Sequence, residues 1–292
     1  MDHIVSFLNH LEFEKRYSKR TIESYHTDLL QFDHYCNKVE VSLLSADSKL
    51  IRSWIVSLLE GGCANRSVNR KISTLKSFYK YYLREGAITA NPLVKVDSLK
   101  NKKRLPVFVT ENQIMQLFDE IDFGADLAGH RNKLIIELFY VTGMRLSELI
   151  NIKYKDIDHT NLTIKVLGKR NKERVIPVTL DMLKSINCFI ELCRQELDGA
   201  SDYLFTTGKG QKMYPKLVYR IVTTALGLVT TMDKRSPHVL RHTFATHMLN
   251  NGAEISAIKE LLGHSNLAAT QVYTHNTFEK LKRIYKQAHP RA

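Results

Sequence analysis

The strongest constraint on the fold is the spacing of apolar residues, which repeats every three to four positions along most of the chain. Near the N-terminus, Tyr25, Leu29 and Phe32 recur at this spacing. A second apolar stripe runs over residues 68–83, and Gly86 stands where its C-cap is expected. A single apolar face at this period is typical of amphipathic helices. Residues 1–95 are therefore predicted to form an all-helical domain.

A polar and basic stretch, VDSLKNKKRLP, follows and ends at Pro106, as an interdomain linker would. Helical patterns resume at Thr110, a suitable N-cap, and continue with one interruption. The interruption is NLTIKVLGKRNKERVIPV, whose alternating apolar residues flank a polar turn and predict an antiparallel hairpin. The predicted fold is mainly α, with domains at 1–95 and 107–292, a basic linker at 96–106 and a tail helix over 277–288.

The charge balance points to an anionic partner. The chain has 43 Lys and Arg against 30 Asp and Glu, a formal net charge of +13. Such a surplus attracts the phosphate backbone of nucleic acids, although simple solubility is the alternative. The candidate phosphate contacts lie beside the second apolar stripe and in the linker, where a solvated charged flank is the alternative: Arg66, Arg70, Lys76, Lys80, Lys102, Lys103 and Arg104.

Several classes of protein are disfavoured. The four cysteines are scattered and show no zinc-ligand spacing, and the sequence has no phosphate-binding loop for ATP. No run of 18 apolar residues is present, and charged residues interrupt the N-terminal segment where a signal peptide would be apolar. We therefore expect a soluble, cytoplasmic protein without metal or cofactor.

Five short blocks carry the residues suited to chemistry on a phosphate: TGMRLSEL, GKRNKER, HVLRHTFATH, LGHS and TQVYTH. In the first block, Arg145 begins a new helix, where Glu148 can orient its guanidinium. In the third, His238 and Arg241 share one face near a helix N-terminus, which favours an anion. Each pattern alone is weak, because single surface residues of these types are common.

Taken together and in this order, the five blocks resemble those of the tyrosine recombinases, the phage integrase family, and most closely their bacterial Xer group. The resemblance covers essentially the whole chain. It implies an N-terminal SAM-like core-binding domain and a C-terminal catalytic domain. Its catalytic set maps onto Arg145, Lys169, His238, Arg241, His264 and Tyr273. The hairpin has Arg170 where the family commonly has glycine, which adds a candidate phosphate contact and leaves Lys172 as the alternative to Lys169.

The resemblance also implies a mechanism. Tyr273 would attack the phosphodiester and form a 3′-phosphotyrosyl link, which a free 5′ hydroxyl then reverses, without ATP or metal. A tyrosine hydroxyl has a pKa of about 10, so a cationic pocket or a base must activate it. The two arginines and His264 would hold the phosphoryl oxygens, His238 would act as the base, and Lys169 would protonate the leaving 5′ oxygen.

The expected partners follow from the same resemblance. They are a double-stranded DNA recombination site, a tetramer on two such sites formed with itself or a paralogue, and a cell-division DNA translocase. The tail helix would dock into a neighbouring subunit. The expected role is resolution of chromosome dimers at cell division. The alternatives are an integrase of a phage or mobile element, an enzyme that relaxes DNA by resealing the same strand, and a non-catalytic sequence-specific DNA-binding protein.

Overall fold

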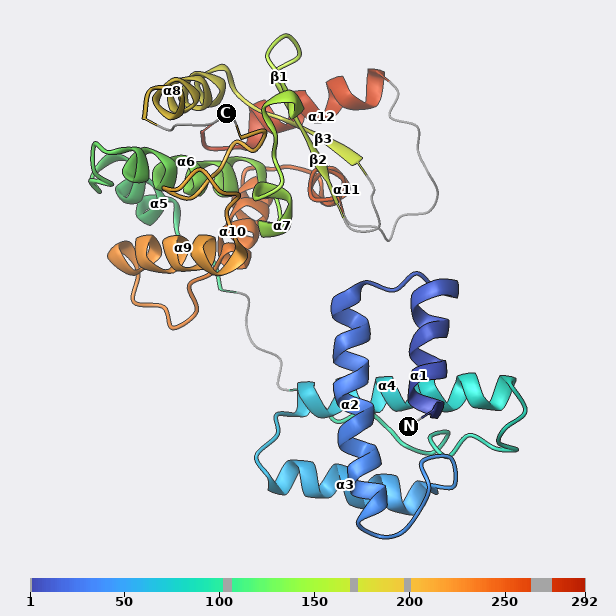
Figure 1. Cartoon of the computed structure of the whole chain (residues 1–292). Coiled ribbons are helices and arrows are strands. Elements are labelled where there is room, and N and C mark those ends of the chain that lie inside the picture. Colours follow the sequence, from blue (N-terminus) through green and yellow to red (C-terminus); the bar gives the residue numbers. More distant parts are fainter. Residues whose placement is uncertain (1, 102–106, 169–172, 197–200, 264–274, 292) are drawn as a thin grey trace. The chain divides into compact units, whose positions relative to one another are not determined.

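The chain folds into two compact units, Met1–Arg104 and Leu105–Ala292 (Figure 1). The computed structural model describes residues 2–101, 107–168, 173–196, 201–263 and 275–291, with the backbone alone described for 275–280. Both units are mainly helical, and the second also contains a small antiparallel sheet. The predicted fold class is confirmed.

The described part of the first unit contains four helices, and side-chain capping sets the start of two of them. They are α1 (Asp2–Asn9), which continues into a π-helical turn (His10–Glu14), α2 (Lys19–Asn37), α3 (Ser48–Glu60) and α4 (Asn65–Arg84). The side chains of Ser18 and Asp47 cap α2 and α3 by accepting hydrogen bonds from backbone N–H groups in the first turn. Helix α4 ends just before Gly86, whose φ of +73° supplies the left-handed turn.

Aromatic and aliphatic residues from all four helices form the core of this unit, including Phe7, Phe32, Trp54 and Phe78. After α4 the chain returns along the same unit. The Asn69 side chain donates to the Leu99 carbonyl and accepts from the Leu99 N–H, at 2.9 and 2.7 Å. Val96 is buried in the core. The first residues of the segment predicted as a linker therefore pack on the helices of the first unit.

The second unit is larger. Its helices are α5 (Glu111–Asp119), α6 (Leu127–Thr142), α7 (Leu146–Leu149), α8 (Leu180–Glu196), α9 (Pro215–Val229), α10 (Pro237–Asn250), α11 (Ile255–Leu261) and α12 (His275–Ala288). Helix α6 packs against both α8 and α10. Its inward positions, among them Ile135, Phe139 and Tyr140, are fully buried, which explains why this segment is so strongly apolar in sequence.

The sheet has three strands in the order β1 (Ile157–Asp158), β2 (Thr163–Leu167) and β3 (Glu173–Pro177). Strands β2 and β3 form the predicted hairpin, with Val166 paired opposite Arg174. The short strand β1 pairs with the start of β2 and was not predicted. Helix α12 contacts β3, α10 and α11, and buries Leu281 and Tyr285 in the core of its own unit. In the parts of the chain that the structure describes, no helix has the length and apolar character needed to cross a bilayer.

Candidate active site

The centre of the candidate site is the junction between α6 and α7. Gly143 ends α6 in the left-handed conformation, with φ of +58°. A Cβ atom at this position would lie 2.6 Å from the Phe244 ring and 2.8 Å from a Leu262 methyl group, so only glycine fits. Arg145 follows two residues later in extended conformation as the N-cap of α7. The tight turn thereby directs the Arg145 side chain toward α10 and α11.

Glu148 holds Arg145 in place. Its carboxylate is fully buried and accepts the backbone N–H of Arg145 at 2.7 Å and the Arg145 Nη1 at 2.8 Å. The same Oε1 atom also accepts from Arg174 Nη1 on β3, at 2.5 Å. Arg145 Nη2 donates to the Gly263 carbonyl at 3.0 Å. The predicted orienting role of Glu148 thus has a direct geometric basis.

Arg241 approaches from α10 and is only 8% exposed. Its Nη1 donates to the Gly143 carbonyl at 2.6 Å, and its Nη2 donates to the Leu262 carbonyl at 2.8 Å. The neighbouring carbonyl, that of Gly263, holds Arg145. The end of α11 and the α6–α7 turn therefore fix two guanidinium groups next to each other.

The cluster carries more positive than negative charge. Glu148 pairs with Arg145 and Arg174, and the guanidinium of Arg241 lies near enough for its pKa to respond to all three of these charges. Burial and, to a smaller extent, the charges of Arg145 and Arg174 together lower the pKa of Arg241 to about 10, while the charge of Glu148 partly opposes them. Burial alone would raise the pKa of Glu148, but hydrogen bonds and charge from Arg174 and then Arg145 hold it below its ordinary value. The surplus makes the site suited to binding an anion.

The remaining predicted catalytic residues are placed less completely. His238 lies in the first turn of α10, three residues before Arg241, and is exposed. Lys169, Arg170 and the alternative Lys172 lie between β2 and β3 in the sequence, outside the described residues, as do His264 and Tyr273. The helices on either side of residues 264–274 are α11, which ends at Leu261, and α12, which begins at His275.

The predicted phosphate contacts of the first unit share one helix. Arg66, Arg70, Lys76 and Lys80 all lie on α4 and are exposed. Lys102, Lys103 and Arg104 fall outside the described residues. Arg70 does not extend freely into solvent, since its Nη1 is bonded to the carboxylate of Asp28 on α2.

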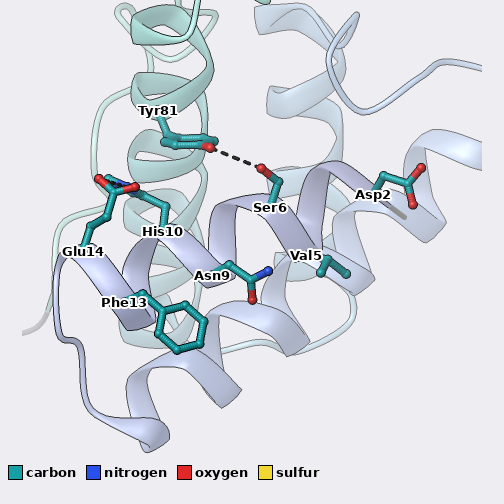
Figure 2. A pocket seen from close by; sticks show the side chains of 8 residues that line it. All are labelled: Asp2, Val5, Ser6, Asn9, His10, Phe13, Glu14 and Tyr81. Carbon is teal, nitrogen blue, oxygen red and sulfur yellow. Dashed lines mark hydrogen bonds and ion pairs between the residues drawn. The ribbon is translucent and has the colours of Figure 1, made fainter.

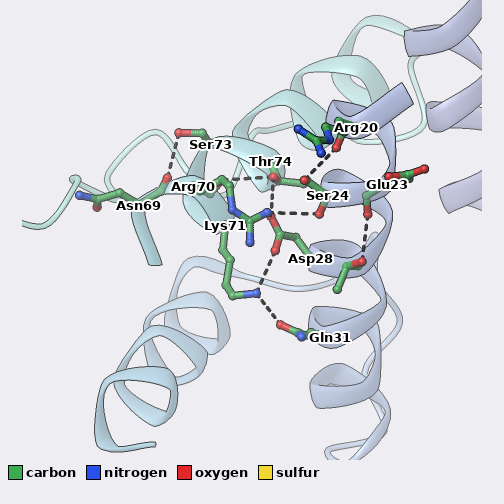
Figure 3. Close-up of polar contacts among 11 residues, drawn as sticks. Arg20, Glu23, Ser24, Asp28, Gln31, Asn69, Arg70, Lys71, Ser73 and Thr74 are labelled. Atoms are coloured by element: carbon green, nitrogen blue, oxygen red, sulfur yellow. Dashed lines mark hydrogen bonds and ion pairs between the residues drawn. The ribbon is translucent and has the colours of Figure 1, made fainter. Parts of the chain in front are cut away.

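Asp28 is the centre of a buried polar cluster between α2 and α4 (Figure 3). This fully buried carboxylate also accepts from Lys71 Nζ at 2.9 Å and from the Thr74 hydroxyl at 3.0 Å. Lys71 in turn donates to the Gln31 side chain. Two cations thus share one buried carboxylate, and the sequence pattern alone did not identify Asp28 or Lys71.

A second feature missed from the sequence is a buried aromatic and histidine cluster behind the site. The Tyr140 hydroxyl and His247 Nδ1 are 3.0 Å apart, and His289 Nε2 lies 3.2 Å from the Tyr140 carbonyl oxygen. Burial lowers the pKa of His289 to about 4 and also lowers that of His247. The HVLRHTFATH block contains His247, but nothing in the sequence indicated its partners 107 residues upstream and near the C-terminus.

A hollow beside α1 has the opposite character to the arginine cluster. Figure 2 shows His10 stacked on Tyr81, with ring centroids 4.7 Å apart, and the Tyr81 hydroxyl 3.2 Å from that of Ser6. The charged residues at its rim include Asp2 and Glu14. The two carboxylates at its rim disfavour a phosphate backbone there.

The fold and the cluster define a two-unit, mainly helical protein in which Arg145, Arg174 and Arg241 gather around Glu148. The chain belongs to the phage integrase family. The model of the "Phage integrase family" matches residues 107–280, and that of the "Phage integrase, N-terminal SAM-like domain" matches residues 4–86. It is therefore a tyrosine recombinase, an enzyme that cleaves and rejoins DNA strands. The family and the enzyme class predicted from the sequence are confirmed.

Individual relatives agree with this assignment over nearly the full length. The tyrosine recombinase XerC of Staphylococcus saprophyticus is 38% identical over 287 residues, covering 98% of this chain and 97% of the relative. XerC of Chlorobaculum parvum is 35% identical over 316 residues, covering 98% and 94%. The XerH site-specific recombinase bound to a palindromic difH substrate, in a post-cleavage complex, has a similar fold with a TM-score of 0.72. That structure is 23% identical and covers 92% of this chain and 76% of its own.

Proposed function

We propose that Arg145 and Arg241 bind the non-bridging oxygens of the scissile phosphate during site-specific recombination. The observation that carries this proposal is the anchoring of both guanidinium groups on the carbonyls of Gly143, Leu262 and Gly263. A guanidinium has five N–H donors, so donors remain on each arginine after these contacts. Fixed donors with surplus positive charge stabilise the charge that develops on a phosphoryl group in the transition state.

The nucleophile in this proposal is Tyr273, which forms the 3′-phosphotyrosyl intermediate. His264, directly after Gly263, donates a further hydrogen bond to the phosphate. His238 accepts the tyrosine proton, a general-base role that histidine side chains commonly fill. Lys169 protonates the departing 5′ oxygen, and Lys172 is the alternative donor from the same turn.

The duplex is proposed to lie along the basic residues of both units. Their charges neutralise backbone phosphates and release counterions, which gives affinity independent of sequence. The proposed contacts are Arg66, Arg70, Lys76 and Lys80 on α4, Lys102, Lys103 and Arg104 between the units, and Arg170 in the β2–β3 turn.

The biological role that we propose is resolution of chromosome dimers at cell division, in the cytoplasm. Support comes from the extent of the match to bacterial XerC proteins, which covers 98% of this chain. The enzyme would act as a tetramer on two double-stranded recombination sites, with itself or a paralogue as partner and a cell-division DNA translocase as a further partner. The tail over 277–288 would dock into a neighbouring subunit, in exchange for part of its packing on its own unit.

A nicked suicide duplex tests the catalytic proposal. The duplex carries the sequence that the protein selects from a random library, and a nick beside the cleavage position lets the 5′-hydroxyl fragment diffuse away. Wild type should accumulate a covalent protein–DNA adduct, and Tyr273→Phe should form none while still binding the duplex. Tyr203→Phe, which keeps the ring that Lys153 and Lys212 contact, is the matched control and should react like wild type. An adduct of Tyr273→Phe would place the nucleophile elsewhere.

A further inference from the structure

Arg174 occupies a position where the strand pattern calls for an apolar residue. On β3 the side chains alternate between solvent and core, and Arg174 and Ile176 both point inward. Arg174 is only 6% exposed. Placing a guanidinium in a core is costly unless its donors are satisfied, so this arginine requires an explanation.

The contacts of Arg174 satisfy it only in part. Its Nη1 donates to Glu148 Oε1 at 2.5 Å. Its Nε and Nη2 are buried and have no hydrogen-bond partner among the residues that the structure describes. An apolar residue of similar volume at such a site is often neutral or favourable for stability. Stability alone therefore does not explain the choice of arginine here.

The location of Arg174 connects it to the catalytic arginine on two sides. Through Glu148 Oε1 it shares an acceptor with Arg145 Nη1, which lies 2.8 Å from the same oxygen. It also packs against Gly263, where an added Cβ would lie 2.9 Å from Arg174 Cδ and 3.1 Å from Nη1. The carbonyl of that glycine accepts from Arg145 Nη2. Arg174 thus contacts both groups that hold the Arg145 guanidinium.

We propose that Arg174 is a positioning residue, which fixes Arg145 through Glu148 and Gly263. This inference rests on the proposed function, in which Arg145 binds the scissile phosphate. It assigns no contact between Arg174 and the DNA. Its consequence is that the charge and the geometry of Arg174 affect cleavage more than they affect DNA binding.

The test compares Arg174→Met and Arg174→Lys with wild type in single-turnover cleavage of the selected nicked duplex. Methionine removes the charge, and we expect cleavage to slow by about 100-fold, as small displacements of catalytic groups do. Lysine keeps one donor for Glu148 and should restore activity to within about tenfold of wild type. Glu173→Gln is the matched control, because Glu173 is exposed on the same strand and pairs with Lys165 on the surface. It should cleave like wild type.

A double-mutant cycle separates positioning from a general effect on the fold. If Arg174 acts through Glu148, the double variant should cleave less than about threefold more slowly than Glu148→Gln alone. The full factor of the single Arg174→Met variant should not appear. Purely multiplicative effects would overturn the inference. Circular dichroism and duplex binding are measured at the reaction temperature, where all variants must be folded and must bind within about fivefold of wild type.

The pH profile gives a readout that a structural role would not change. The charged groups near Glu148 are Arg145 at the start of its own helix α7, Arg174 on β3 and, at longer range, Arg241 on α10. Removing the Arg174 charge raises the pKa of Glu148, so the acidic limb of the cleavage profile should move to higher pH in Arg174→Met. An unchanged profile with an unchanged rate would refute the inference and leave the proposed function intact. Failure of wild type to form any adduct would instead refute the proposed function itself.

Discussion

Glu148→Gln is the substitution whose effect on stability can be worked out most directly from the structure. It keeps the shape of the side chain but removes the carboxylate that pairs with Arg145 and Arg174. Removing one partner of a buried ion pair costs about 3–5 kcal/mol, because the other charge stays buried and uncompensated. Arg145 is 31% exposed and regains some hydration, so the lower end applies. We expect the free energy of unfolding to fall by about 3 kcal/mol.

This loss should be visible by calorimetry. For a domain of roughly 150–250 residues, each kcal/mol changes the melting temperature by about 2–4 °C, so the transition of the unit Leu105–Ala292 should fall by about 6–12 °C. Glu191→Gln is the control, since Glu191 pairs with Arg194 on the exposed side of α8 and such pairs contribute about 0–1 kcal/mol. If Glu148→Gln melted no lower than this control, the bridging role of Glu148 would be wrong.

The difference in stability between wild type and Glu148→Gln should also depend on pH. Because the pKa of folded Glu148 is lowered, the unfolded state binds more protons as the pH falls. The stabilisation is therefore complete above the unfolded pKa of about 4.3 and is lost as the pH falls through the folded value. The difference in melting temperature between wild type and Glu148→Gln should be constant near neutrality and should shrink below about pH 4.

Two further predictions concern other buried charges. Asp28→Asn leaves Lys71 and the half-exposed Arg70 without their carboxylate, so the free energy of unfolding in urea should fall by about 3 kcal/mol. Asp33→Asn, on the same helix, is the control. Equal losses in the two variants would contradict the role of the cluster. Burial lowers the pKa of His289 to about 4, so its neutral form is favoured by the fold. Wild type should therefore lose up to about 3 kcal/mol as the pH falls from about 6.5 to about 4, whereas His289→Phe should lack this part of the slope. A variant that kept the wild-type slope in melting temperature against pH would exclude His289 as its source.

Much of the fold was predictable because its signals are local. Thr110 caps α5 by accepting from the Gln113 backbone, and Gly143 takes the left-handed turn that ends α6. Such signals need only a few neighbouring residues, so the sequence displays them directly. The hairpin was predictable for the same reason, because alternation and a polar turn lie within one short segment. The two-residue strand β1 is too short to show any alternation, and it exists only because β2 offers an edge.

The candidate site was predictable only in part. Arg145, Glu148 and Arg241 stand in blocks that the family resemblance identifies, and the structure brings these three together. The partnership of Glu148 with Arg174 spans 26 residues, and that of Asp28 with Lys71 spans 43. A sequence read for helical or strand periodicity has no signal for such pairs, because they form only when separate elements pack.

The most direct test of the central claim is to identify the residue that carries the DNA in the covalent adduct. The adduct from the nicked suicide duplex is digested with nuclease and protease, and the peptide that retains a nucleotide is sequenced by mass spectrometry. The proposal predicts a 3′-phosphate linked to Tyr273, within the TQVYTH block. A nucleotide attached to any other residue, or linked through its 5′-phosphate, would contradict it.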